Sequence, residues 1–187
     1  FEKPGDQTAT YGDQAFTNAA TNNTSGGGGA ITYSSSDENV ATVDANGQVT
    51  IVGAGTATIT ATAAAVEGYA ETPASYTLTV NPKEITATAT VQDKTYDGTT
   101  AAEAAVTFDG LVSGESLTED TDYTVEAVFA DADADTDKTV NVTITLLNKN
   151  YKLDGTPITA KATISKATLP GMNTTLLMEK TAGFKRA

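Results

Sequence analysis

The 187-residue chain has no histidine, cysteine or tryptophan, and it has only two methionines. The lack of cysteine excludes a disulfide framework and thiolate chemistry, although it does not exclude secretion. The lack of histidine removes the usual general base and the commonest metal ligand. A catalytic centre would have to be built from carboxylates, lysine and tyrosine, so we predict that the protein is not an enzyme.

Basic residues are also scarce, because 11 Lys and Arg stand against 24 Asp and Glu, which gives a net charge of −13. Binding to nucleic acid or to an anionic membrane needs clustered positive charge, so neither is expected. The chain contains no 18-residue apolar run, which predicts no membrane insertion within it. The acidic surface disfavours self-association, which predicts a monomer. Because the chain begins at Phe1 and not at Met, we interpret it as a piece of a longer protein.

What the chain has in abundance is the alternation of apolar residues with Thr or small polar residues, the pattern of half-buried strands. Three such runs lie within residues 38–63: Val40–Val43, Val49–Val52 and Ala57–Ala63. Asn46-Gly47 separates the first two and predicts a hairpin with a type I′ turn, which needs positive φ at both central residues. Gly53 and Gly55 predict a second tight reversal. Residues 38–63 are therefore expected to form a β-meander.

The strand pattern occurs twice along the chain. Asn81-Pro82 follows the alternating run Tyr76–Val80 and interrupts strand pairing, because proline lacks the N–H that a ladder needs. Alternation then resumes in five segments: Ile85–Val91, Ala105–Phe108, Tyr123–Phe129, Val140–Leu146 and Ile158–Ile164. This repetition favours two tandem domains over a solenoid of shorter repeats.

Landmark residues recur at a matched spacing in the two halves. Tyr11 and Tyr96 lie 85 residues apart, and Val80 and Ile164 lie 84 apart. We predict domains at residues 1–81 and 82–168, with 169–187 as a linker or the truncated start of a next module. The fold class is predicted to be all-β. The first domain is expected to be an immunoglobulin-like sandwich of about seven strands, and the second a β-sandwich or a β-grasp-like variant.

The first half resembles the bacterial immunoglobulin-like domains of group 2. The resemblance is carried by Ile31–Ser36, Val40–Val43, Asn46-Gly47 and the run Gly53–Ala61 (Gly-Ala-Gly-Thr-Ala-Thr-Ile-Thr-Ala). It covers roughly residues 1–81 and implies an immunoglobulin-like fold without catalytic residues.

The second half resembles the YDG-type repeats of large bacterial surface proteins. The matching residues are Lys94–Ala101 (Lys-Thr-Tyr-Asp-Gly-Thr-Thr-Ala), Gly110–Glu115 and Asn150–Leu153. Such repeats usually carry a glycine in the loop that here reads 131–137, so the shape of this loop departs from the family pattern.

Both resemblances imply non-catalytic modules of long extracellular chains at a bacterial cell surface. The function expected from them is that of a rigid spacer, whose partners are the neighbouring domains of the same polypeptide. The alternative is an adhesion module that binds a host glycan or protein through its loops. An exposed, contiguous aromatic patch would favour this alternative.

The feature that most suggests a binding site is a run of acids at alternate positions: Asp131, Asp133, Asp135 and Asp137. Carboxylates are the hard oxygen ligands that Ca²⁺ prefers, so the run is a candidate metal site, and Ca²⁺ is the one cofactor considered. Against this, the run lacks the glycine and the terminal glutamate of an EF-hand loop. If it were extended, its carboxylates would share one face at about 7 Å spacing. The second interpretation is a solvated acidic loop.

Two further groups of residues invite functional hypotheses. Glu115, Glu119, Asp120 and Asp122 could hold a glycosidase pair of carboxylates, but they lie in a Ser/Gly/Thr-rich turn without an aromatic platform. The tyrosines are scattered over different predicted strands, which is more typical of core or end-capping residues than of a carbohydrate site. In particular, Tyr11 and Tyr96 are expected to cover the ends of their sandwiches.

Overall fold

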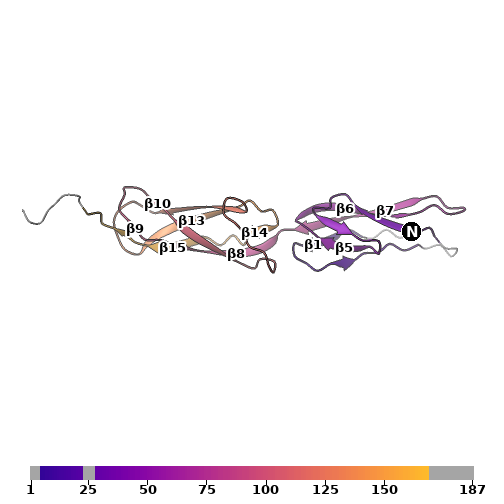
Figure 1. The fold of residues 1–187 in the computed structure, drawn as a ribbon, viewed down its shortest axis with the longest axis horizontal. Helices are drawn as coiled ribbons and strands as arrows, with labels where there is room; N and C mark the ends of the chain where they lie inside the picture. The colour runs from indigo at the N-terminus through magenta and orange to yellow at the C-terminus, as the bar shows by residue number, and fades with distance from the viewer. Residues whose placement is uncertain (1–4, 23–27, 169–187) are drawn as a thin grey trace, which may run out of the picture.

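The structure is a computed structural model that describes residues 5–22 and 28–168. These two ranges contain sixteen β-strands and no helix, which confirms the predicted all-β class. Within them, accordingly, no helix is long and apolar enough to span a membrane. Figure 1 shows two elongated units placed end to end. The predicted linker or next module at 169–187 lies outside the described residues.

The first unit is a β-sandwich of two sheets. One sheet contains, in order, β1 (Gln7–Thr10), β7 (Thr72–Asn81), β6 (Gly55–Ala63) and β3 (Ile31–Ser35). The other contains β2 (Phe16–Thr17), β5 (Gln48–Ile51) and β4 (Ala41–Val43). Alternate residues of β6 and β7 are buried, because successive side chains of a strand face opposite sides. The core is built mainly from small and β-branched residues: Ala9, Val40, Ala41, Val49, Ala57, Ile59, Tyr76, Leu78 and Val80.

The strands predicted within residues 38–63 are confirmed, but the meander is wrong. β4 and β5 form an antiparallel hairpin, whereas β6 lies in the opposite sheet between β3 and β7. The chain changes sheet after Ile51, where the N–H groups of Val52 and Gly53 both donate to the Val40 carbonyl. A Cβ at Gly53 would lie 2.6 Å from the Asn39 carbonyl oxygen. The glycine is therefore needed for a crossing between sheets, not for a hairpin.

The turn of the β4–β5 hairpin also differs from the predicted type I′. Gly47 has a φ of 76°, but Asn46 does not have a positive φ. The Gly47 N–H donates to the Asp44 carbonyl at 3.1 Å, and the Asp44 N–H donates to the Gln48 carbonyl at 2.9 Å. This is a three-residue loop, with a type I turn followed by a left-handed glycine. The Asp44 carboxylate stabilises it by accepting the N–H groups of Asn46 and Gln48, each at 2.8 Å.

The second unit is also a β-sandwich, which was one of the two predicted alternatives. Its largest sheet contains, in order, β10 (Ala101–Ala102), β12 (Tyr123–Phe129), β13 (Lys138–Leu146) and β15 (Ile158–Ala162). A second sheet contains β11 (Ala104–Asp109), β8 (Lys83–Val91) and β14 (Tyr151–Leu153). The short strands β9 (Lys94–Thr95) and β16 (Ile164–Ser165) pair with each other. Its buried core is Ala127, Phe129, Val140, Val142, Ala162 and Ile164.

The two units end in the same way. In the first, β1 is parallel to β7, and in the second, β9 is parallel to β16. The residue after the leading strand then donates its backbone N–H to the last residue of the closing strand. Tyr11 donates to Asn81 at 2.9 Å, and Tyr96 donates to Ser165 at 2.8 Å. The matched spacing in the sequence therefore corresponds to a tyrosine that lies beside the point where the chain leaves each unit.

We expect Gly47→Ala to destabilise the first unit by about 1–3 kcal/mol. The substitution forces a left-handed conformation on a residue with a Cβ, and this Cβ would lie 3.0 Å from the Tyr33 ring. Urea denaturation followed by circular dichroism measures the loss. Gly68→Ala is the matched control, because Gly68 has a φ of 84° but nothing lies within 4 Å of an added Cβ. Equal losses in the two variants would contradict a contribution from the Tyr33 contact.

Candidate functional site

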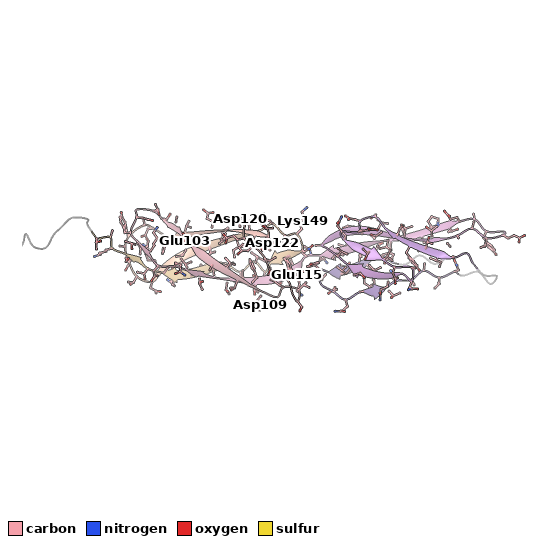
Figure 2. All side chains as sticks on the ribbon, viewed as in Figure 1. Glu103, Asp109, Glu115, Asp120, Asp122 and Lys149 are labelled. Carbon is pink, nitrogen blue, oxygen red and sulfur yellow. The ribbon has the colours of Figure 1, made fainter. Side chains whose placement is uncertain are left out.

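The candidate functional site is the junction between the two units, and its centre is one carboxylate shared by two tyrosines. Tyr11 of the first unit donates its hydroxyl hydrogen to Glu115 Oε1 at 2.5 Å, and Tyr151 of the second unit donates to Glu115 Oε2. The two rings pack edge to face, with centroids 5.5 Å apart. We call these three residues the Tyr–Glu–Tyr cluster. Figure 2 shows Glu115 at the end of the second unit that faces the first.

Local backbone structure positions each member of the cluster. Tyr11 follows β1 and is held beside Asn81 by its backbone N–H. Glu115 ends a tight turn in which its N–H donates to the Val112 carbonyl at 3.0 Å. The Val112 N–H in turn donates to the Tyr151 hydroxyl oxygen at 3.1 Å. Because this hydroxyl both donates and accepts, its orientation is fixed. Tyr151 is also only 3% exposed.

Asn150 forms a second link across the junction. Its side-chain Oδ1 accepts the backbone N–H of Ala54, in the first unit, at 2.8 Å. Its backbone carbonyl accepts the N–H of Lys83, at the start of β8, at 2.9 Å. The side chain of Asn148 orients it from the second unit, because Asn148 Oδ1 accepts the Asn150 N–H at 3.0 Å. Asn150, which immediately precedes Tyr151, therefore fixes the first unit to the second beside the Tyr–Glu–Tyr cluster, through a different segment of the first unit.

The backbone of the first unit lies close to side chains of the second, and glycine makes this possible. A Cβ at Gly12, which has a φ of 90°, would lie 2.6 Å from Val112 Cγ2 of the second unit. A Cβ at Gly53 would lie 3.2 Å from Asn150 Oδ1. The covalent connection is equally short, since Pro82 alone separates β7 from β8. The junction is thus a packed contact around a single connecting residue, with no flexible linker.

Both tyrosines of the cluster have a pKa above the ordinary 10.0. For Tyr11 the hydrogen bond to Glu115 is the largest cause, and burial adds to it. For Tyr151 burial is the largest cause, and together with the hydrogen bond to Glu115 it raises the pKa to about 12. A phenolate cannot donate a hydrogen bond to a carboxylate, so the cluster favours the neutral hydroxyls.

The acidic run considered as a calcium site lies in the loop between β12 and β13. Its four carboxylates are exposed, while the alanines between them are partly buried. Lys138 pairs with Asp131 and also donates to the Asp133 carbonyl at 2.7 Å. The hydrogen bond from Lys138 holds the pKa of Asp131 below its ordinary value. Within residues 5–22 and 28–168, no three acidic side chains gather where they could hold a metal ion. Calcium binding by Asp131, Asp133, Asp135 and Asp137 stays a prediction.

Two of the four acids that suggested a glycosidase site, Glu115 and Asp122, make structural contacts, while Glu119 and Asp120 are exposed. Glu115 belongs to the Tyr–Glu–Tyr cluster. Asp122 accepts the N–H of Thr118 at 2.9 Å and the side-chain amide of Asn148 at 3.0 Å. It therefore ties the turn before β12 to the segment that carries Asn150. These contacts give Glu115 and Asp122 a role in building the end of the second unit that faces the first.

An open depression of about 390 Å³ in the second unit is lined by three acids, Asp93, Asp97 and Glu103, together with Lys94. Asp97 pairs with Lys94 at 2.8 Å. The hydrogen bond from Lys94, followed by that from the Thr99 N–H, lowers the pKa of Asp97 to about 2. A general acid works best with a pKa near the operating pH, so Asp97 is unsuited to that role.

The sequence alone does not reveal the Tyr–Glu–Tyr cluster. Glu115 is separated from Tyr11 by 104 residues and from Tyr151 by 36. In the sequence, Glu115 is one acid among several in a polar turn. The expectation that Tyr11 covers the end of its sandwich is confirmed by its packing on Tyr151. The one sequence feature that points to the cluster is the matched placement of Tyr11 and Tyr96. It predicts that each tyrosine lies at an end of its sandwich, but it does not identify Glu115 as the partner of Tyr11.

The fold and the junction define a tandem of two β-sandwich modules, and comparison with known families gives a match for each of them. The family model of the intimin immunoglobulin-like domain matches residues 15–65, and that of the YDG domain matches residues 81–160. The chain thus carries an immunoglobulin-like module followed by a YDG domain, in the order expected from its sequence.

No curated protein matches the chain. Among solved structures, extracellular domains 3–5 of Drosophila OTK are 9% identical with a TM-score of 0.35, over 89% of this chain and 60% of that one. Drosophila N-cadherin EC1-4 is 12% identical with a TM-score of 0.38, over 89% and 48%. A SusE-like surface-located polysaccharide-binding protein from Bacteroides thetaiotaomicron is 14% identical with a TM-score of 0.33, over 91% and 34%. The chain thus spans less than two thirds of each of these structures.

We expect the junction to weaken at high pH. The pKa values of Tyr11 and Tyr151 are raised, that of Tyr151 to about 12, so their contribution to stability is fully present below pH 10 and is lost as the pH rises through these raised pKa values. Absorbance at 295 nm follows tyrosine ionisation. Burial also raises the pKa of Tyr76 and Tyr123, so the assignment needs Tyr11→Phe and Tyr151→Phe. If neither variant removes a late-titrating group, the hydrogen bonds to Glu115 are contradicted.

We expect the acidic loop to behave as a solvated loop, because Lys138 already occupies the Asp131 carboxylate. Thermal unfolding in Ca²⁺ and in EDTA should then give the same midpoint. The double variant Asp133→Asn, Asp135→Asn is the matched control for calcium-specific effects. A midpoint that rises with Ca²⁺ in the parent chain, and not in this variant, would establish the calcium site instead.

Proposed function

We propose that this chain is a non-catalytic structural segment of a large bacterial cell-surface or secreted protein, in which it acts as a stiff spacer. Its role is to hold other domains of the same polypeptide away from the surface. The observation that carries this proposal is the packed junction. A spacer keeps its two ends far apart only if its modules cannot bend freely about their connection.

The contacts at the junction oppose bending from more than one point. Any hinge motion about Pro82 that separates Tyr11 from Glu115 also breaks the edge-to-face contact with Tyr151. A hydrogen bond to a charged group contributes about 1.5–3 kcal/mol and an aromatic pair about 0.5–1.5 kcal/mol. Tyr11 is only partly buried, so we take about 2 kcal/mol for the hydrogen bond and the aromatic pair together. A bent state that breaks both contacts is then populated roughly 30-fold less than the straight state.

An extracellular setting is supported by the matches to an intimin immunoglobulin-like domain and to a YDG domain. The absence of cysteine and histidine supports a role without catalysis. The exposed face of β6 carries Thr56 and Thr58. Threonine hydroxyls keep such a face hydrated without adding charge.

One observation favours the second candidate function, adhesion through the loops. Tyr69, in the loop between β6 and β7, is 58% exposed and lies beside an open depression of about 270 Å³. Exposed tyrosines are common in binding surfaces because the ring is apolar and the hydroxyl is polar. Tyr69 and Tyr96 are the exposed aromatic residues of the described ranges, and they belong to different units, so they form no contiguous patch.

The spacer function is tested by the distance between the units in solution. Because the chain has no native cysteine, Thr58→Cys in β6 and Thr143→Cys in β13, both exposed, provide unique sites for spin labels. We expect double electron–electron resonance to give one narrow distance distribution. Tyr11→Ala and Glu115→Gln should each broaden it, because both weaken the Tyr–Glu–Tyr cluster.

Tyr69→Ala is the matched control, since it removes an exposed tyrosine of the same unit that is not part of the junction. It should leave the distance distribution unchanged. A broad distribution in the parent chain would contradict the spacer function. Equally narrow distance distributions in Tyr11→Ala and in Tyr69→Ala would also contradict it.

A further inference from the structure

Tyr96 occupies in the second unit the position that Tyr11 occupies in the first. Each follows a leading strand that is parallel to the closing strand of its unit, and each bonds through its N–H to the last residue of that closing strand. Their environments nevertheless differ. Tyr11 packs against Tyr151 and Glu115, whereas Tyr96 is 46% exposed, and its hydroxyl has no hydrogen-bond partner in the described part of the chain.

Tyr96 lies at the end of the second unit opposite to the junction. β8 starts at the junction with Lys83 and runs for nine residues to Val91, a length of about 30 Å, before the chain reaches β9. Figure 1 shows β9 at the end of the second unit that is far from the first. The closing strand β16 ends there too, at Ser165 beside Tyr96. The chain therefore leaves the second unit next to an exposed tyrosine, as it leaves the first next to a packed one.

The residue after the tyrosine differs between the two ends, and the charge that it brings to the second end is paired locally. Gly12 follows Tyr11, but Asp97 follows Tyr96. The Asp97 carboxylate accepts hydrogen bonds from the N–H and the hydroxyl of Thr99, at 2.8 and 2.9 Å, and pairs with Lys94 at 2.8 Å. It is thereby turned back onto its own loop with its charge neutralised. Asp97 thus places no unpaired carboxylate at this end of the second unit.

We propose that the Tyr96 end of the second unit is a docking surface for a following β-sandwich module, whose facing end carries a carboxylate beside a tyrosine. Tyr96 would donate its hydroxyl to this carboxylate and pack on this tyrosine, as Tyr11 does with Glu115 and Tyr151. This proposal rests on the spacer function and extends it by naming the chemistry of the next contact.

A module of the same polypeptide is the occupant to which the observations point. The chain leaves the unit beside Tyr96, so the next module is held at a high effective concentration, as the second unit is at the existing junction. A separate copy has no such advantage, and its approach is opposed by a net charge of −13 on each chain.

The test is an internal duplication that keeps every residue of the chain. A second copy of residues 82–165 is inserted directly after Ser165, so that Pro82 follows Ser165 as it now follows Asn81. The first-copy Tyr96 then faces a Glu115 and a Tyr151, while the second-copy Tyr96 remains at the outer end. Small-angle X-ray scattering of the original chain and of the duplicated chain measures the maximum dimension and the bending of each.

We expect the duplicated chain to scatter as a straight rod, longer than the original by at least the length of a nine-residue strand, about 30 Å. Tyr96→Ala in the first copy should make the new joint bend. The same substitution in the second copy is the matched control and should change nothing. Tyr96→Phe in the first copy keeps the ring and removes the hydroxyl, so it should give an intermediate result, and circular dichroism checks that each variant folds.

A duplicated chain that bends freely at the new joint would overturn the proposal, and so would equal effects of Tyr96→Ala in the two copies. The original chain separates this failure from that of the spacer function. If the original chain is straight and only the new joint bends, the docking surface is wrong and the spacer stands. If the original chain also bends, both are wrong.

Discussion

The carboxylate of Glu115 lies between two tyrosine hydroxyls that belong to different units, and the relative orientation of the units depends on this contact. It is effective because three independent features meet there. The Tyr11 and Tyr151 rings pack edge to face, Gly12 allows the backbone to approach Val112, and Pro82 is the only residue between β7 and β8. Removing the carboxylate would take away the group to which both hydroxyls donate, and the loss of a hydrogen-bond partner is unfavourable where Tyr151 is buried.

The position of Tyr11 follows from strand direction. Because β1 and β7 are parallel, the residue after β1 lies beside the residue from which the chain leaves the unit. A side chain at that position therefore lies at the end of the unit where the closing strand ends. The same arrangement of β9 and β16 places Tyr96 beside Ser165. A pair of parallel terminal strands is thus a simple way to put a recognition residue at the connection between modules.

Much of the fold could be predicted from the sequence, because period-two alternation is a local signal. It located β6 and β13, for example, within a few residues. What it could not supply is the sheet that each strand joins, so residues 38–63 were expected to form a meander although β6 lies opposite β5. The turn at Asn46-Gly47 was mistaken in type because Asp44, two residues earlier, stabilises a different loop. The place of Glu115 at the junction could not be predicted, because its partner Tyr11 is 104 residues away and no local pattern marks the pair.

A stiff spacer requires that the two units tumble as one body in solution. Residual dipolar couplings of the backbone N–H groups test it most directly, because each unit reports its own alignment tensor. A rigid junction predicts that couplings from β1–β7 and from β8–β16 fit one common tensor with the orientation seen in the structure. Two tensors of clearly different magnitude would mean that the units move independently, and that result would contradict a rigid junction.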